Sequence, residues 1–194
     1  MNEDAELRGG FSSRQARRRG PRFQPEFCRA IVAVIPVEMF VVDMGAGAYG
    51  PYVKWMRENG WPDACGIDAS PNSPSLSKGL VSVGNLTTPN VSFVLFGRNP
   101  EWILFREVGE HIPEQFNPDI FRMLATAISG VLLSWTIPGQ RWNGHINCQA
   151  PEWVSGKMDA VGFRVDNAAT AAAVRAMGRR PDKNLMVFVN RGQL

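Results

Sequence analysis

The decisive stretch of the sequence is VVDMGAGAYGPYV, residues 41–53. It joins an apolar run to three glycines, Gly45, Gly47 and Gly50, in the spacing G-x-G-x-x-G. This pattern is typical of a buried strand, a tight turn and the start of a helix, where a pyrophosphate can bind. Asp43, however, lies two residues before the first glycine, and its carboxylate would repel a pyrophosphate. The stretch therefore predicts a strand–turn–helix site for a ligand that tolerates a nearby acid.

Apolar runs and helical patterns alternate along the chain on both sides of this stretch. Strands are expected over residues 39–44, 63–68, 80–86, 101–108, 130–137, 161–166 and 184–190. Helices are expected over residues 25–35, 51–59, 118–129, 151–160 and 168–178, and residues 71–79 form a Pro- and Ser-rich loop. This alternation predicts an α/β fold with a mainly parallel sheet.

Length and charge predict one domain and a basic tail. The chain has 194 residues and a net charge of +3, which suits a single domain over residues 23–194 after a tail over residues 1–22. The tail gathers arginines between Arg14 and Arg22. The simpler interpretation is a solvated segment. The more specific one is an arm that contacts RNA or another acidic partner.

The sequence also limits the compartment. It has no run of about 18 uncharged apolar residues, so we expect no membrane span, and the early acids Glu3 and Asp4 argue against a secretory signal. Three widely spaced cysteines, Cys28, Cys65 and Cys148, are an odd number and predict free, mostly buried thiols. We therefore expect an intracellular, reducing compartment, the cytoplasm rather than an organelle.

Polar residues follow the expected strands at their carboxyl ends, where parallel α/β sheets bind ligands. Asp68 lies 23 residues after Gly45 (68 − 45), at the end of the second strand, and Asn85 follows the third. A dinucleotide enzyme would use such an acid for ribose hydroxyls. S-Adenosylmethionine has a ribose but no phosphate, and it carries a cationic amino group. Asp43 suits that amino group and Asn85 suits the adenine amine, so the charges favour the methyl donor over a dinucleotide.

These residues carry a resemblance. The chain resembles class I (Rossmann-like) S-adenosylmethionine-dependent methyltransferases over roughly residues 39–189. "VVDMGAG" matches the first motif of that superfamily, "GIDAS" is similar to its second-strand acid motif, and "EVGEHIP" resembles the segment after its fourth strand. "LLSWTIPGQ" followed by "GHINC" is similar to methyltransferase-like proteins of algae, protists and viruses. The resemblance implies a Rossmann-like three-layer sandwich whose mostly parallel seven-stranded sheet ends in an antiparallel strand.

The resemblance also implies a transferase with S-adenosylmethionine as its donor and an unidentified methyl acceptor. The residues expected to bind the donor are Asp43, Gly45, Gly47, Asp68, Asn85, Leu86 and Glu107. His111, flanked by Glu110, could act as a general base if the acceptor must lose a proton. The competing interpretation is that both hydrogen-bond the backbone at the start of the next helix. His145 lines the acceptor pocket or orders its own loop.

Some positions depart from the superfamily pattern, and they support an alternative. Tyr49 stands where a third glycine is common, Arg106 places a cation at a usually apolar position, and Arg141 and Trp142 are bulky. A catalytically inactive, methyltransferase-like structural subunit of a larger complex is therefore the second hypothesis. The sequence predicts no metal site, because neither histidine has a second ligand at metal-binding spacing.

Overall fold

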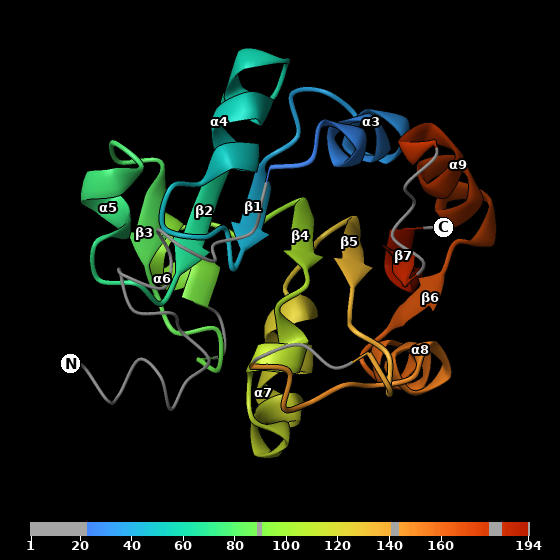
Figure 1. Ribbon diagram of the computed structural model, residues 1–194. Coiled ribbons are helices and arrows are strands. Elements are labelled where there is room, and N and C mark those ends of the chain that lie inside the picture. Colours follow the sequence, from blue (N-terminus) through green and yellow to red (C-terminus); the bar gives the residue numbers. More distant parts are fainter. Residues whose placement is uncertain (1–22, 89–90, 141–143, 179–183, 194) are drawn as a thin grey trace.

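The computed structural model describes residues 23–88, 91–140, 144–178 and 184–193 (Figure 1). Its centre is a seven-stranded sheet with the order β3-β2-β1-β4-β5-β7-β6. The strands are β1 (Val41–Met44), β2 (Cys65–Asp68), β3 (Val81–Val83), β4 (Trp102–Arg106), β5 (Gly130–Ser134), β6 (Phe163–Val165) and β7 (Leu185–Asn190). Neighbours among β1 to β5 pair in parallel, and β7 runs antiparallel to β5 and β6. The predicted mostly parallel sheet with an antiparallel last strand is confirmed.

Helices cover both faces of the sheet, which makes three layers (Figure 1). The helices are α3 (Pro25–Val34), α4 (Pro51–Glu58), α5 (Ser73–Leu76), α6 (Val91–Phe96), α7 (Asn117–Leu124), α8 (Pro151–Ala160) and α9 (Asn167–Met177). Proline occupies the first turn of α3, α4 and α8, where its missing N–H costs nothing. The Asp166 side chain caps α9 by accepting from the Ala169 N–H at 2.9 Å.

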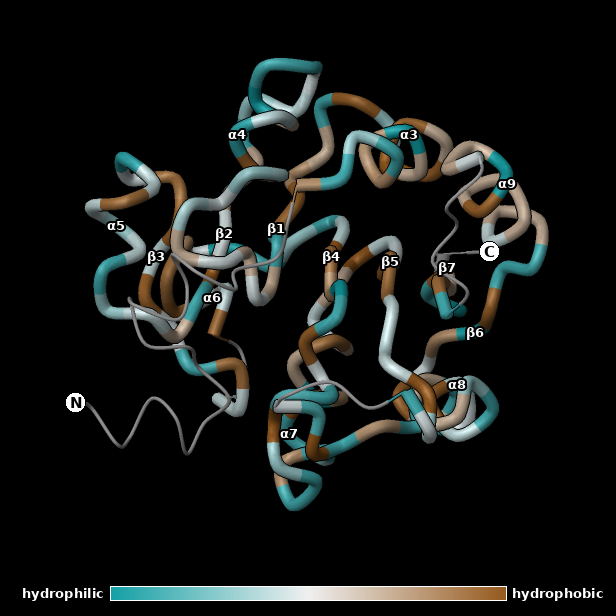
Figure 2. The backbone as a smooth tube through the Cα atoms, viewed as in Figure 1, coloured by the Kyte–Doolittle hydropathy of each residue, from teal (hydrophilic) through white to brown (hydrophobic). Residues whose placement is uncertain are grey.

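Alternation along the strands divides the core into two apolar clusters, one for each face. Val41 and Leu104 pack with α3, α4 and α9, whereas Val42 and Ile103 pack with α7 and α8. Figure 2 shows the corresponding hydrophobic colour along β1, β4 and β5. Asp43 follows the register of Val41, so its side chain belongs to the face that α3 and α4 cover.

All three cysteines are free, as predicted. Cys28 and Cys65 are buried in the core, and Cys148 is half-buried. Burial raises the pKa of Cys28 to about 11 and that of Cys65 to about 12. Both core thiols therefore stay protonated and pack as small apolar groups.

Several element boundaries differ from those expected, and local hydrogen bonds explain why. The third strand ends at Val83 rather than Leu86, because Asn85 accepts from the Thr87 N–H and hydroxyl and turns the chain. The helix expected over 118–129 ends at Leu124, where the chain turns. Helix α5 lies inside the segment expected to be a loop, and α6 was not predicted.

Two further expectations concern membrane spans and the basic tail. In the parts of the chain that the structure describes, no helix has the length and apolar character needed to cross a membrane. The predicted basic tail, with its arginines between Arg14 and Arg22, lies outside the described residues.

Candidate functional site at the carboxyl edge of the sheet

The glycine turn after β1 has a backbone that only glycine adopts without strain. Gly45, Gly47 and Gly50 have φ angles of 84°, 69° and 54°. A Cβ on Gly45 would lie 2.4 Å from Cγ2 of Val108, and the Gly45 N–H donates to the Ile67 carbonyl at 2.8 Å. The turn is therefore fixed between β2 and the segment after β4, and Gly50 starts α4.

Asp68 holds the same turn from the end of β2. Its Oδ2 accepts from the Gly47 N–H at 3.0 Å and its Oδ1 from the Ser70 N–H at 2.8 Å. Burial raises the pKa of Asp68, and the two amide hydrogen bonds together with the nearby Ser73 hydroxyl oppose that rise. The two amides use one lone pair on each carboxylate oxygen, so Asp68 keeps acceptor capacity for hydroxyl groups.

Asp43 is a buried acid with an unsatisfied oxygen. Its side chain is 4% exposed, and Oδ2 has no hydrogen-bond partner among the described residues. Burial raises its pKa to about 7, although the nearby Arg106 guanidinium pulls the pKa down. A group that is costly to ionise in place is stabilised as a carboxylate when a cation binds beside it.

Asn85 and Leu86 follow β3, next to Asp68. The Gly84 N–H donates to the Asp68 carbonyl at 3.0 Å, which places Asn85 directly after the contact, and Leu86 is buried. Both lone pairs of Asn85 Oδ1 are engaged by Thr87. The role of Asn85 toward an adenine amine stays a prediction.

Glu107 lies just past β4 with φ of 52°, in the left-handed region. Its Oε1 accepts from the Ser134 hydroxyl at 2.7 Å, and its Oε2 from the Thr136 hydroxyl at 3.0 Å. Sequence reasoning missed Ser134 and Thr136; the available signal was two polar residues at a spacing of two, ending an otherwise apolar strand.

Glu110 is fully buried beside Glu107. The Thr136 hydroxyl also contacts Glu110 Oε1, at 2.8 Å, and Oε2 has no partner within the described part of the chain. Burial and the neighbouring Glu107 raise the pKa of Glu110 to about 8. Because Thr136 has one hydroxyl proton, it can donate to only one of the two carboxylates at a time. A second proton or a cation is needed to satisfy the pair.

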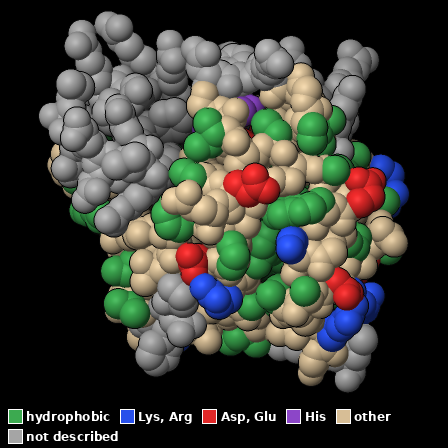
Figure 3. Space-filling view, turned by 90° about the horizontal axis from the view of Figure 1, so that it is seen from below, with side chains coloured by type: hydrophobic (Ala, Val, Ile, Leu, Met, Phe, Trp, Pro, Cys, Tyr) green, Lys and Arg blue, Asp and Glu red, His purple; other side chains and the backbone are tan. Residues whose placement is uncertain are grey.

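The two histidines meet at this edge, although they are far apart in the sequence. The rings of His111 and His145 are 4.9 Å apart between centroids and nearly perpendicular. The His111 Nδ1 lies 3.0 Å from the Gly144 carbonyl, and burial lowers the pKa of His111. His111 belongs to the 3-10 helix η1 (Gly109–His111), not to an α-helix. Figure 3 shows histidine as a small recessed area between apolar and other side chains.

The loop after β5 is held against η1 by a buried asparagine. The Asn147 amide nitrogen donates to the carbonyls of Gly109 and Ile112 and to Asn117 Oδ1. The Trp135 indole N–H donates to the Asn147 carbonyl at 2.6 Å. Trp135 is 1% exposed and belongs to the core.

Two of the residues that depart from the superfamily pattern, Tyr49 and Arg106, lie among the described residues. Arg106 donates to Gln24 Oε1 at 2.8 Å, and its guanidinium lies 4.8 Å from the centroid of the Phe27 ring. Tyr49 is 46% exposed, which shows that its ring does not fill an interior cavity. Arg141 and Trp142 lie outside the described residues.

Comparisons with known proteins find structural neighbours but no match in sequence. No protein-family model matches the sequence, and no curated protein matches it. The sugar N-methyltransferase KedS8 from Streptoalloteichus is 14% identical with a TM-score of 0.65, covering 90% of each chain. Magnesium protoporphyrin IX methyltransferase from Synechocystis, solved with bound SAH, is 15% identical with a TM-score of 0.54, covering 78% of this chain and 74% of its own.

A third neighbour is a chain of a complex between the Haloferax volcanii methyltransferase activator Trm112 and a methyltransferase. It is 12% identical with a TM-score of 0.58, covering 87% of this chain and 89% of its own. At such identities the likeness shows the fold alone. The chain has the Rossmann-like fold of the methyltransferases.

Proposed function

We propose that this protein is an S-adenosylmethionine-dependent methyltransferase. The observation that carries the proposal is the pair of acids at the carboxyl edge: Asp43 is buried with an unsatisfied oxygen, and Asp68 holds the Gly47 amide with lone pairs to spare. S-Adenosylmethionine supplies what this pair lacks, namely a cationic amino group and two adjacent ribose hydroxyls. Methyltransferases that share the fold, one of them solved with SAH, support the same ligand.

In this proposal the first two strands bind the donor. Asp68 accepts from the ribose hydroxyls, Gly45 and Gly47 allow close approach of the backbone, and Asp43 faces the amino group. Asn85 and Leu86 line the adenine side, and Glu107 lies toward the methionine portion. Glu110, His111 and His145 lie on the acceptor side, past β4 and β5. Much of the rate of methyl transfer comes from alignment of the acceptor with the methyl group.

The alternative of an inactive structural subunit fits the buried acids less well. An unsatisfied, buried carboxylate lowers stability, and a purely structural fold gains nothing from it. Tyr49 was one residue that could have filled the donor site, and its exposure argues against that role. We therefore propose an active enzyme.

Assignment to the methyltransferase-like branch of algae, protists and viruses is part of the proposal, and it is supported by "LLSWTIPGQ" and "GHINC" in the sequence. Membership of a larger complex is a further part, because one structural neighbour was solved with an activator protein. The arginines between Arg14 and Arg22 are the proposed contact to RNA or another acidic partner.

Calorimetric titration with S-adenosylhomocysteine tests the donor site. We expect saturable binding to the wild-type protein and a loss of at least about 100-fold in affinity for Asp68→Ala, since two hydrogen bonds to a carboxylate disappear. Asp63→Ala is the matched control, because Asp63 precedes the same strand and lies at the opposite edge of the sheet. Circular dichroism confirms that each variant is folded. Absence of binding to the wild-type protein at millimolar ligand would refute the proposal.

A further inference from the structure

A carboxylate and two imidazoles lie together past the ends of β4 and β5. The potential ligand atoms of Glu110, His111 and His145 all lie within 4.8 Å of one another. The fold assembles this group from two segments: η1 supplies the first two residues, and the loop after β5 supplies the third. The N–H groups of Ile146 and Asn147 both donate to the Glu110 carbonyl, at 2.8 and 3.1 Å. These backbone bonds fix His145 beside the other two.

Both histidines are oriented in the way that metal-binding histidines usually are. His111 Nδ1 lies 3.0 Å from the Gly144 carbonyl, and His145 Nδ1 lies 3.4 Å from the Gln140 carbonyl. A carbonyl oxygen can only accept, so each Nδ1 carries the proton of this contact, and the tautomer that binds a metal has its lone pair on Nε2. A second-shell carbonyl on the other ring nitrogen holds a ligand in the required tautomer and orientation.

Glu110 supplies an independent sign that a ligand is expected here. It is fully buried, and its Oε2 has no hydrogen-bond partner among the residues described. Its Oε1 competes with Glu107 for the hydroxyl proton of Thr136. A buried carboxylate oxygen needs a partner, and a cation between Glu110 and the histidines would provide one and would also offset the charge of Glu107.

We propose that Glu110, His111 and His145 bind one divalent transition-metal ion. Two imidazole nitrogens and one carboxylate favour ions such as Zn²⁺, Mn²⁺ or Fe²⁺ over Mg²⁺ and Ca²⁺, which prefer oxygen ligands throughout. Three protein ligands leave coordination positions open for water or for an oxygen atom of another molecule. That this oxygen belongs to the methyl acceptor rests on the proposed function; the metal site itself does not.

Direct binding of Mn²⁺ and Zn²⁺ tests the site without any enzyme assay. The full chain is stripped with a chelator and titrated by calorimetry, and bound Mn²⁺ is also followed by the loss of its free-ion electron paramagnetic resonance signal. We expect one ion per chain, and at least about 100-fold weaker binding for His145→Ala and Glu110→Gln, each of which removes one ligand. Glu114→Gln is the control, because this exposed acid lies only three residues from His111, outside the ligand set.

The same variants show whether the metal site and the proposed donor site are independent of each other. Titration with S-adenosylhomocysteine on His145→Ala should give the wild-type affinity, which also shows that the variant is folded. Stoichiometric metal binding that survives in both His145→Ala and Glu110→Gln would place the ion elsewhere and overturn the inference. Absence of metal binding to the wild-type chain would also overturn it, and if S-adenosylhomocysteine still bound, the donor proposal would stand.

Discussion

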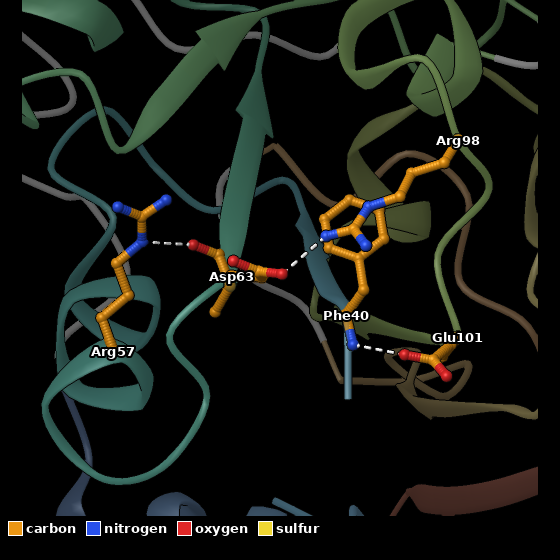
Figure 4. A network of polar contacts seen from close by, with 6 residues as sticks. Phe40, Arg57, Asp63, Arg98 and Glu101 are labelled. Carbon is orange, nitrogen blue, oxygen red and sulfur yellow. Dashed lines mark hydrogen bonds and ion pairs between the residues drawn. The ribbon is translucent and has the colours of Figure 1, made fainter. Parts of the chain in front are cut away.

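Acidic side chains have different surroundings at the two edges of the sheet, the amino edge where the parallel strands begin and the carboxyl edge where they end. At the amino edge, Glu101 accepts from the Phe40 N–H at 2.7 Å, and Asp63 pairs with Arg98 at 2.9 Å (Figure 4). The Arg98 guanidinium in turn lies 3.9 Å from the centroid of the Phe40 ring. At the carboxyl edge, Asp43 and Glu110 are buried and each has an oxygen without a partner among the described residues.

The difference separates acids whose partners lie within the chain from acids that have an oxygen without a partner among the described residues. At the amino edge, Glu101 and Asp63 both have partners among the described residues. The carboxyl edge keeps carboxylates at a cost in stability, and ligand-binding sites of parallel α/β sheets lie at that same edge. The comparison therefore predicts that neutralising an acid has opposite effects on stability at the two edges.

The largest effect is expected from a glycine that shapes the carboxyl edge. Gly45→Ala should destabilise the fold by about 2–4 kcal/mol, because alanine is strained at a φ of 84° and its Cβ would meet Val108 at 2.4 Å. Rotation of Val108 gives no relief, since its other methyl and its Cβ lie only 3.0 and 3.3 Å away. Urea denaturation measures the change.

Gly79 offers the matched control for that substitution. It has nearly the same φ, 85°, but nothing lies within 4 Å of an added Cβ. Gly79→Ala should therefore cost only about 1 kcal/mol, the strain without the clash. Equal losses for the two variants would show that the contact of the glycine turn with Val108 is unimportant, and that the carboxyl edge is not fixed as described.

Neutralising Asp43 should stabilise the protein. Asp43→Asn removes a carboxylate whose pKa is raised from 3.8 to about 7 by burial, so we expect a gain of about 1–3 kcal/mol at pH 8. The folded state holds the proton more tightly than the unfolded state. The cost of ionisation is therefore absent below about pH 4, grows between pH 4 and 7, and is complete above pH 7. The gain should shrink as the pH is lowered from 8 to 4.

The same change at the amino edge gives the contrast. Glu101→Gln weakens a charge-assisted hydrogen bond to the Phe40 N–H and should cost about 1 kcal/mol. Thermal unfolding of both variants between pH 4 and 8 measures the expected gain in stability for Asp43→Asn and the expected loss for Glu101→Gln. A loss of stability for Asp43→Asn at pH 8 would mean that the attraction to Arg106 outweighs burial, and the distinction between the edges would fail for this acid.

The sequence predicted the parts of the candidate site whose residues lie close together in the chain, but not the contacts between distant segments. Gly45, Gly47 and Asp43 could be placed because a strand, a turn and a helix start follow one another within a few residues. Asp68 could be placed because parallel strands end at one edge. His145 could not be brought to Glu110 from the sequence, since their approach depends on backbone bonds between two distant loops. Thr136 was missed because nothing in an apolar strand reveals which carboxylates its hydroxyl contacts.

The smallest effect is expected at the exposed end of the amino-edge network. Asp63 and Arg98 form an ion pair, but their side chains are 61% and 53% exposed, and such pairs contribute little in water. Asp63→Asn should therefore change the free energy of unfolding by less than about 0.5 kcal/mol, and added salt should remove most of that change. A loss above about 1 kcal/mol that persists in 1 M salt would show that the Arg98 guanidinium needs Asp63 to stay over the Phe40 ring. The amino edge would then depend on a coupled network rather than on the part-buried hydrogen bond between Glu101 and the Phe40 N–H alone.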